Sequence, residues 1–206
     1  YLFIRNVKGL IALVQMGVLE IHPWGVRVDR PNRPDRVIFD LDPGDGVGFT
    51  DVMEAAHELR RALSKLDLTA FVKFTGGKGL HVVVPIVRSY DWPTVKAFAR
   101  NTAKAMAERA PGQYLIRTPK AERKGRIFID YLRNDATATA IAPYSTRAKQ
   151  GAPVAVPLSW EELTPELDPA AFTIETVPQR LKQLNNDPWA DIGRMHQRLP
   201  AAATKV

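Results

Sequence analysis

Two carboxylates stand one residue apart at the end of an apolar run, in the sequence VIFDLDPG (37–44). In an extended strand, residues two apart share a face, with their Cα atoms about 7 Å apart. Asp40 and Asp42 would therefore project together from a strand end and could hold divalent cations, which enzymes of phosphoryl transfer keep ~3.5–4 Å apart. The pattern is equally compatible with an exposed strand end that carries two solvated acids.

A third acid, Asp130, ends a later apolar stretch, RIFID (126–130). Carboxylates that converge from two strands suit hard cations such as Mg²⁺ or Mn²⁺, whose oxygen ligands leave room for substrate phosphates. One cation would lower the pKa of an attacking hydroxyl, and the other would neutralise a leaving pyrophosphate. For Asp130 alone, a capping or salt-bridging role explains the residue equally well.

A glycine-rich segment, TGGKGLH (75–81), lies between the first and third acids. Glycines let backbone N–H groups approach an anion, and Lys78 adds positive charge, so the segment could cradle a phosphate. Its spacing is not that of a P-loop, and as a hairpin turn it needs no function. His81 could donate to a phosphate oxygen or simply occupy a strand edge. Guanidinium and ammonium groups further along could clamp a triphosphate, or be solvated as basic loop residues usually are: Arg123, Lys124, Arg126 and Arg147.

The hydrophobic pattern predicts how these residues are positioned. Between residues 36 and 131 the expected order is strand (36–42), helix (51–66), strand (70–75), strand (80–87), helix (94–109) and strand (126–131). The middle two strands form a hairpin across the glycine-rich turn. This order is the split βαβ or ferredoxin-like arrangement, an antiparallel sheet with the first and third strands central and the fourth beside the first.

Flanking elements are also expected. They are a largely buried helix within 6–18 that stops near Gly17, a short strand near 137–142, and short helices near 159–163 and 178–185. Asp51 is expected to cap the helix over 51–66, with Glu54 three residues on.

Alternation along the four strands predicts one apolar and one polar face of the sheet. The apolar face, expected against the helices, comprises Val37, Phe39, Leu41, Val72, Phe74, Leu80, Val82, Val84, Ile127 and Ile129. The opposite face comprises Asp40, Asp42, Lys73, Thr75, His81, Arg126 and Asp130. In this topology we expect His81 to lie close to Asp42. The agreement of four strands on one polar face is the main support for a site.

Composition narrows the class of protein. The 206 residues are 45% hydrophobic, enough for a core, and the net charge of +7 favours a polyanionic partner such as nucleic acid or nucleotide phosphates, although a surplus kept for solubility is compatible. The chain has no cysteine, which excludes disulfides and thiolate metal sites. Neither an apolar run approaching the ~20 residues of a membrane span nor a signal peptide is visible. We expect one domain over 1–206, with 193–206 as a linker or tail.

The motifs DLD (40–42), TGGKGLH (75–81), ID (129–130) and IAPYSTR (141–147) follow the order of those in archaeo-eukaryotic primases. Over residues 1 to about 192, the chain resembles the polymerase domain of bacterial ATP-dependent DNA ligase D. HPW (22–24), DRP (29–31) and PW (188–189) also look like that family. The resemblance implies an α+β primase-like core with flanking helices and short extra strands.

The resemblance also implies an activity. It is template-dependent nucleotidyl transfer that fills gaps and extends ends at DNA double-strand breaks, with Mn²⁺ or Mg²⁺ as a cation pair and NTPs or dNTPs as substrates, ribonucleotides being favoured. The metal-binding and catalytic acids would be Asp40, Asp42 and Asp130. The nucleotide-binding residues would be Thr75, Lys78, Gly79, His81, Arg123 and Arg147, the two arginines orienting the third acid or the triphosphate. Arg133 stands where relatives often carry an uncharged polar side chain.

Partners implied by the resemblance are DNA ends, gaps and primer-templates, nucleoside triphosphates, ligase and nuclease modules of the same polypeptide, and an end-binding protein. The expected setting is the bacterial cytoplasm, at the nucleoid. The family's polymerase domain has an N-terminal portion ahead of the point matching Tyr1. It binds the 5′-phosphate of a gap and stacks on template bases, so we expect this chain to grip DNA poorly.

Two other classes of protein were weighed. A haloacid-dehalogenase-type phosphatase also ends a strand in D-x-D, but it favours Thr or Val where Gly44 stands, and its doubly wound sheet disagrees with the predicted order. A basic DNA-binding fragment with weak or no catalysis is the second alternative. The presence of all three acids and of His81 argues against degeneration.

Overall fold

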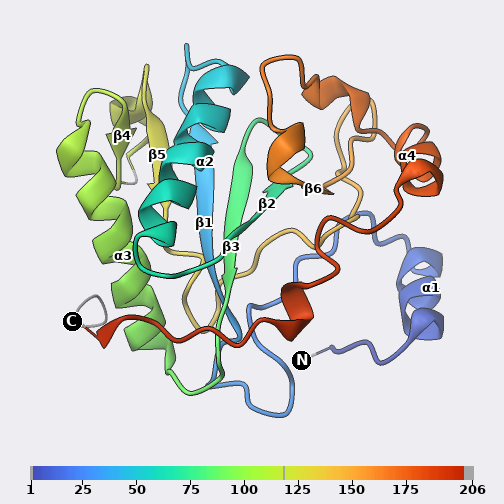
Figure 1. The fold of residues 1–206 in the computed structure, drawn as a ribbon. Coiled ribbons are helices and arrows are strands. Elements are labelled where there is room, and N and C mark those ends of the chain that lie inside the picture. Colours follow the sequence, from blue (N-terminus) through green and yellow to red (C-terminus); the bar gives the residue numbers. More distant parts are fainter. Residues whose placement is uncertain (1, 118, 202–206) are drawn as a thin grey trace.

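A six-stranded sheet organises the chain in this computed structural model, which describes residues 2–117 and 119–201 (Figure 1). The strand order is β4-β5-β1-β3-β2-β6, and all neighbours are antiparallel except the parallel pair β4 and β5. The strands are β1 (Arg36–Pro43), β2 (Phe71–Phe74), β3 (Leu80–Pro85), β4 (Tyr114–Leu115), β5 (Ile127–Asp130) and β6 (Val156–Leu158). As predicted, β1 and β3 are central and β5 lies beside β1.

Two long helices cover one face of this sheet (Figure 1). The α-helices of the described residues are α1 (Val7–Gln15), α2 (Phe49–Ser64), α3 (Trp92–Arg109) and α4 (Val177–Gln183), joined by short 3₁₀ turns. The prediction of an α+β fold with a split βαβ core is confirmed. The predicted helix near 159–163 is a 3₁₀ turn, Trp160–Glu162.

The core lies between the sheet and α2 and α3. Val37, Phe39 and Leu41 of β1 are fully buried, as are Leu59 of α2 and Phe98 of α3. Burial of each such side chain contributes about 1.5–3 kcal/mol. Every apolar position predicted from strand alternation belongs to this one cluster. The alternate positions of the same strands therefore point to the other face, where the acids are.

The predicted cap of α2 is wrong in its position. The helix begins earlier, with Gly48 as its N-cap, and the Gly48 N–H donates to the Asp51 carboxylate at 2.9 Å. Asp51 is thus the third residue of the helix, where a carboxylate stabilises the unpaired N–H groups. At α3 the cap is Asp91, which accepts from the Thr94 N–H at 3.0 Å, with Pro93 in the first turn.

The second face of the sheet is partly covered by two other segments of the chain, residues 137–142 and the segment around Trp189, which we call the roof. Ile38, Val83, Ala140 and Trp189 form a small apolar cluster there. The Trp189 indole N–H donates to the Val72 carbonyl at 3.0 Å, which ties the roof to β2. The polar face is therefore not a solvated surface, and its side chains lie in a partly enclosed space.

The predicted strand near 137–142 is wrong. In that stretch Thr139 forms a single isolated bridge with Trp24, and the sheet is extended instead by β6 beside β2 and by β4 beside β5. An alternating pattern forms a strand only where a sheet edge is free, and β6 pairs with the edge of β2. The segment 137–142 crosses the polar face as part of the roof.

The predicted burial of the first helix is also wrong. Asn6 caps α1 by accepting from the Gly9 N–H at 3.2 Å, and the helix ends before Gly17, which has a φ of 78°. Among its residues only Leu13 is buried, whereas Val7 and Val14 are 66% and 64% exposed. The apolar periodicity correctly indicated a helix, but the sheet's helical face is already filled by α2 and α3.

The C-terminal segment follows the molecule's edge. In the segment 193–206, expected as a tail, Leu199 is buried in the core and the Gln197 side-chain amide donates to the Thr69 and Pro85 carbonyls. Residues 202–206 of that segment lie outside the described residues.

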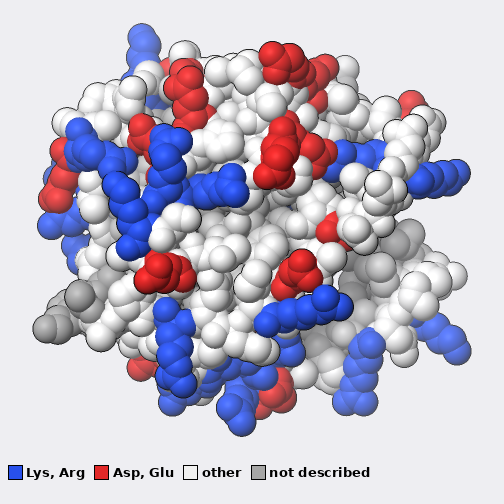
Figure 2. All heavy atoms as spheres, in the orientation of Figure 1, with Lys and Arg blue, Asp and Glu red and all other residues white. Residues whose placement is uncertain are grey.

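Within 2–117 and 119–201, no helix combines the length and apolarity needed to cross a bilayer. Side chains of both charges are interspersed over the face seen in Figure 2.

Candidate nucleotide and metal site

Four polar residues form a row across four neighbouring strands. The register sets Asp130 of β5 opposite Asp40 of β1, Asp40 opposite His81 of β3, and His81 opposite Lys73 of β2. Side chains at paired positions project from the same face of a sheet. We call Asp130, Asp40, His81 and Lys73 the cross-strand row. Its existence follows from four independent hydrophobic alternations that agree in register.

Asp40 is largely enclosed, with a side chain that is 13% exposed. Its carboxylate lies 3.5 Å from the His81 Nε2 and 3.0 Å from the Arg133 Nη2. Burial alone would raise the pKa of Asp40, but His81 and Arg133 outweigh burial and lower it to about 2. Burial also lowers the pKa of His81 from its ordinary value of 6.5, so the imidazole is neutral at pH 7. Asp40 is therefore an anion at neutral pH.

Asp130 shares the same guanidinium. The Arg133 Nε lies 3.3 Å from the Asp130 carboxylate and 3.1 Å from the Asp40 carboxylate. Asp130 also accepts from the Leu132 N–H at 2.8 Å. Burial raises the pKa of Asp130, Arg133 opposes that rise, and the charge on Asp40 adds to it. Arg133 thus contacts two of the three acids, whereas only its spacing of three residues from Asp130 indicated such a position in the sequence.

Asp42 lies at the solvent side. Its side chain is 51% exposed and forms an ion pair with the Arg123 Nη1 at 2.8 Å. The Arg123 guanidinium is stacked over the Phe128 ring, 4.0 Å from its centre, which fixes its orientation. The register pairs His81 directly with Asp40, and His81 and Asp42 line the same cavity. Arg123 forms an ion pair with the second acid, and its charge also lowers the pKa of the third.

Lys73 ends the row in the interior. Its side chain is 2% exposed, and its Nζ donates to the Ile141 carbonyl. Burial lowers the pKa of Lys73 to about 7, although the charge on Asp40 opposes that change. The hydrogen bond ties β2 to the roof segment that leads to Arg147. Lys73 was predicted on the polar face, but the sequence did not indicate that this position is buried.

The glycine-rich turn after β2 is fixed by short contacts. The Thr75 hydroxyl donates to the Gly79 carbonyl at 2.9 Å, and Gly76 has a φ of 70°, which favours glycine. A Cβ on Gly79 would lie 2.3 Å from the Leu41 carbonyl oxygen, so this turn is packed directly against the end of β1. Lys78 at its tip is exposed. The turn therefore places Lys78 beside the strand that bears the acids.

Arg147 lies beside this turn. It donates from Nη1 to the Thr75 carbonyl at 2.8 Å, and its Nε lies 3.2 Å from the Glu20 carboxylate. His22, the backbone of Ala148 and Arg147 hold the pKa of Glu20 at about 2 against the opposing effect of its partial burial. Glu20 was not among the predicted site residues, since it stands in an irregular segment ahead of the HPW motif and is not part of that motif.

These residues enclose a cavity of about 210 Å³. Its walls bring together Asp40, Asp42, Thr75, Lys78, Gly79, His81, Arg133 and Arg147, along with His22 and Lys149. All predicted site residues except Asp130 and Arg123 thus line one cavity, and these two contact it through Arg133 and Asp42. The lining carries two acids, Asp40 and Asp42, and four basic side chains, Lys78, Arg133, Arg147 and Lys149. Such a lining suits divalent cations at the acids and phosphates at the basic side chains.

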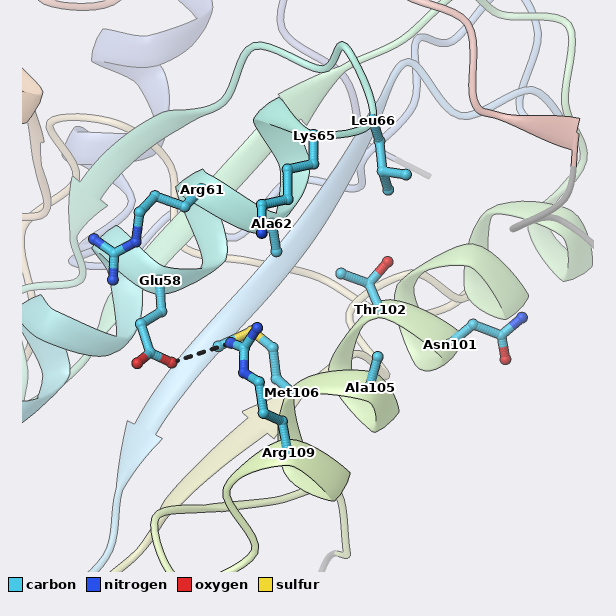
Figure 3. A pocket seen from close by; sticks show the side chains of 10 residues that line it. All are labelled: Glu58, Arg61, Ala62, Lys65, Leu66, Asn101, Thr102, Ala105, Met106 and Arg109. Carbon is cyan, nitrogen blue, oxygen red and sulfur yellow. Dashed lines mark hydrogen bonds and ion pairs between the residues drawn. The ribbon is translucent and has the colours of Figure 1, made fainter.

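A larger cavity of about 600 Å³ lies elsewhere, between α2 and α3 (Figure 3). Ala62 and Leu66 face Ala105 and Met106 across it, and an ion pair between Glu58 and Arg109 at 3.4 Å closes one end. It lies on the helical side of the sheet, whereas the acids point to the opposite side. Its lining includes Arg61, Lys65 and Arg109 but none of the three predicted acids, so size does not identify the site here.

The acids meet the chemical requirement for Mg²⁺ or Mn²⁺, because three carboxylates from adjacent strands supply hard oxygen donors. Their oxygens also contact guanidinium groups, Arg133 at two acids and Arg123 at the third. Throughout the described part of the chain, no three His, Asp or Glu side chains are grouped closely enough to hold a metal ion as they stand. The donor set fits such cations, provided that the arginines give up carboxylate oxygens.

The sheet, its two covering helices and the acid-bearing central strand define an α+β fold of the primase-polymerase class. A family model described as "LigD, primase-polymerase domain" matches residues 1–189, and the chain belongs to that family. The recognition made from the motifs is thereby confirmed.

Relatives agree with this assignment. The "Multifunctional non-homologous end joining protein LigD" of Pseudomonas aeruginosa is 39% identical over 200 residues, which are 97% of this chain and 24% of that protein. The "Bifunctional non-homologous end joining protein LigD" of Bacillus subtilis is 30% identical, over 97% of this chain and 32% of its own. The chain therefore spans about a quarter to a third of these relatives. A solved structure, "Polymerase Domain from Mycobacterium tuberculosis Ligase D in complex with DNA", matches with a TM-score of 0.85 and 28% identity, over 94% of this chain and 70% of that one.

Proposed function

We propose that this chain is a template-dependent nucleotidyltransferase that extends a DNA 3′ end with nucleotides from NTPs or dNTPs. The single observation that carries the proposal is that Asp40 and Asp130 lie opposite each other on neighbouring strands, beside a cavity lined by basic side chains. Membership of the primase-polymerase family supports it. The reaction would join the primer's 3′ oxygen to the α-phosphorus, with pyrophosphate as the leaving group.

Asp40, Asp42 and Asp130 are the residues that would hold a pair of divalent cations, Mn²⁺ or Mg²⁺. Such cations, when bound, supply Lewis-acid activation of the attacking hydroxyl and neutralise charge on the leaving group. One contribution of the chain itself is to keep the carboxylate of Asp40 ionised. Asp40 meets this requirement, because its pKa is held at about 2 although the side chain is enclosed.

The basic side chains of the cavity lining would bind the triphosphate. Lys78 is exposed at the tip of the glycine-rich turn, and Arg147 is oriented by its bonds to the Thr75 carbonyl and Glu20. Gly79 lets the turn pack against β1, which brings phosphate ligands and acids to one cavity. His81, neutral at pH 7, can donate one ring N–H to a phosphate oxygen. Arg123 would orient Asp42 from outside the cavity wall.

The setting of this activity would be repair of DNA double-strand breaks by non-homologous end joining. The printed names of the bacterial relatives support that setting, as does a solved relative in complex with DNA. DNA ends, gaps and primer-templates would be the macromolecular substrates, at the nucleoid. Ligase and nuclease modules of one polypeptide and an end-binding protein are further proposed partners.

A weak or silent DNA-binding role is the second candidate. One observation favours it: Arg123 and Arg133 bind the very carboxylate oxygens that cations would need. Under that reading the basic side chains would bind DNA, and the acids would only orient arginines.

Primer extension decides between the two functions. The wild-type chain is given a labelled primer-template, Mn²⁺ or Mg²⁺ and either NTPs or dNTPs, beside the variant Asp42→Ala. Because Asp42 is half-exposed, that variant keeps the core intact. We expect metal-dependent incorporation by the wild type and none by Asp42→Ala. DNA binding without incorporation in either protein would contradict the proposed function and favour the second candidate.

A further inference from the structure

The position of Arg133 has a consequence for cation binding. Its guanidinium lies between two acids on opposing strand positions, with Nε 3.1 Å from the Asp40 carboxylate and 3.3 Å from the Asp130 carboxylate. Two nitrogens of Arg133 contact Asp40, since Nη2 also lies 3.0 Å from the Asp40 oxygen, Oδ2, that Nε contacts. Two like-charged, enclosed carboxylates repel one another unless a cation lies between them. Arg133 supplies that cation from within the chain.

The backbone beside Arg133 is held firmly. Asn134 is 1% exposed, and its side-chain amide donates to the Ile38 and Tyr131 carbonyls at 2.7 and 2.8 Å. The Ile38 N–H donates back to the side-chain Oδ1 of Asn134 at 2.8 Å. Reciprocal hydrogen bonds between Asn134 and Ile38 thus hold the turn after β5 against β1. Arg133 can leave the acids only by rotating its side chain, and that side chain is 40% exposed at the cavity rim.

We propose that Arg133 and a divalent cation compete for the carboxylates of Asp40 and Asp130, so that Arg133 is a positioning residue that sets the cation affinity of the site. This inference rests on the proposed function and extends it. A cation bound by both acids would face a guanidinium charge at hydrogen-bonding distance from the same oxygens. Coulomb repulsion between the two is strong in a partly enclosed site. Binding of the cation therefore requires the guanidinium to rotate away.

The cavity offers a destination for the displaced guanidinium. Arg133 lines the same cavity as Lys78, Lys149 and Arg147, where phosphates would bind. A guanidinium has a fork of donors that matches phosphate as well as carboxylate. Arg133 would thus exchange its carboxylate partners for a triphosphate oxygen when cation and nucleotide bind together. Cation and nucleotide should consequently bind with positive coupling, which Arg133→Gln would weaken.

Mn²⁺ binding measures the competition without any catalytic step. Free Mn²⁺ is followed by electron paramagnetic resonance during titration of the wild type, Arg133→Gln and Arg133→Lys. Charge-assisted hydrogen bonds of this kind correspond to about ten- to a hundredfold in an equilibrium constant. We expect Arg133→Gln to bind Mn²⁺ tighter by about that factor, and Arg133→Lys, which keeps the charge, to lie nearer the wild type. Arg100→Gln is the control, because Arg100 is exposed on α3, on the helical side of the sheet.

Thermal unfolding separates competition from a merely structural role. Without Mn²⁺, Arg133→Gln leaves two facing carboxylates uncompensated and should melt below the wild type. Saturating Mn²⁺ should remove that difference, because the cation then replaces the guanidinium. A deficit that persists at saturation, or Mn²⁺ binding that is unchanged or weaker in Arg133→Gln, would overturn the competition while leaving the proposed function standing. Absence of Mn²⁺ binding by both proteins would contradict the proposed function itself.

Discussion

Replacement of Lys73 by methionine tests whether the inner end of the cross-strand row is shielded from water. Lys73 is 2% exposed, and burial lowers its pKa to about 7 from an ordinary value of 10.5. Between these values the unfolded chain keeps the proton that the folded chain has lost. Stability therefore rises with pH across this window. From pH 7 to pH 9 the free energy of unfolding of the wild type should increase by about 2 kcal/mol on this account.

The substitution Lys73→Met changes both the pH dependence of the free energy of unfolding and its value at pH 7. Lys73→Met removes a burial cost of about 4 kcal/mol at pH 7, but it leaves the Ile141 carbonyl without its donor, which costs roughly 1–3 kcal/mol. We expect the variant to be about 2 kcal/mol more stable than the wild type at pH 7. The advantage should vanish by pH 9.

Urea denaturation of both proteins at pH 7, 8 and 9 measures this directly. Other groups titrate in both proteins, so the difference between the two stability profiles isolates Lys73. A difference that stays constant from pH 7 to pH 9 would refute the reasoning. It would mean that Lys73 keeps its proton in the folded chain, because water reaches the inner end of the row.

The remaining predictions concern the turn, the acids and DNA. Gly79→Ala sets a Cβ 2.3 Å from the Leu41 carbonyl oxygen and should lower the free energy of unfolding by about 1–3 kcal/mol, measured by thermal unfolding. Gly112→Ala is the control and should cost far less, because a Cβ there meets nothing within 4 Å. Equal losses in the two variants would contradict close packing of the turn against β1. Lys78→Ala should raise KM for NTP about tenfold with an unchanged melting temperature, because Lys78 is exposed and would face phosphate; unchanged KM would remove Lys78 from the site. Asp130→Asn should bring primer extension to background while circular dichroism stays native, and near-normal extension would exclude Asp130 as a cation ligand. DNA affinity measured by fluorescence anisotropy should fall steeply between low and physiological salt, and a salt-independent affinity would contradict phosphate contacts by Lys and Arg.

The parts of the fold that the sequence predicted well are those fixed by period-two alternation. Phe39 and Leu41 alternate with Asp40 and Asp42, so burial of one set forces the other set to the opposite face. The strand order followed from the same reasoning, because a split βαβ arrangement has few alternatives. The acids were thus set on one face of the sheet from the sequence pattern, whereas Arg147 was assigned to the site through the family resemblance.

The failures share a physical cause, which is that local patterns do not report tertiary partners. The periodicity of α1 indicated a helix correctly, but whether Val7 and Val14 are buried depends on what packs against them. The alternating stretch 137–142 had no free sheet edge, because β6 pairs with β2. Burial of Lys73 depends on a roof drawn from two remote segments, and so it was invisible in the strand's own pattern.

Arg133 illustrates the same limit inside the site. Its position three residues after Asp130 is evident in the sequence, but the contact with Asp40 arises from the register of β1 and β5 and from the turn held by Asn134. A one-residue shift in that register would have paired Arg133 differently.

The central claim is that Asp40, Asp42 and Asp130 together hold divalent cations beside a bound nucleoside triphosphate. Anomalous diffraction from crystals soaked with Mn²⁺ and a non-hydrolysable NTP tests it most directly. We predict Mn²⁺ peaks bounded by these three carboxylates, with the triphosphate against Lys78 and Arg147. Mn²⁺ peaks remote from the three acids, or a triphosphate bound with no Mn²⁺ beside them, would contradict the claim.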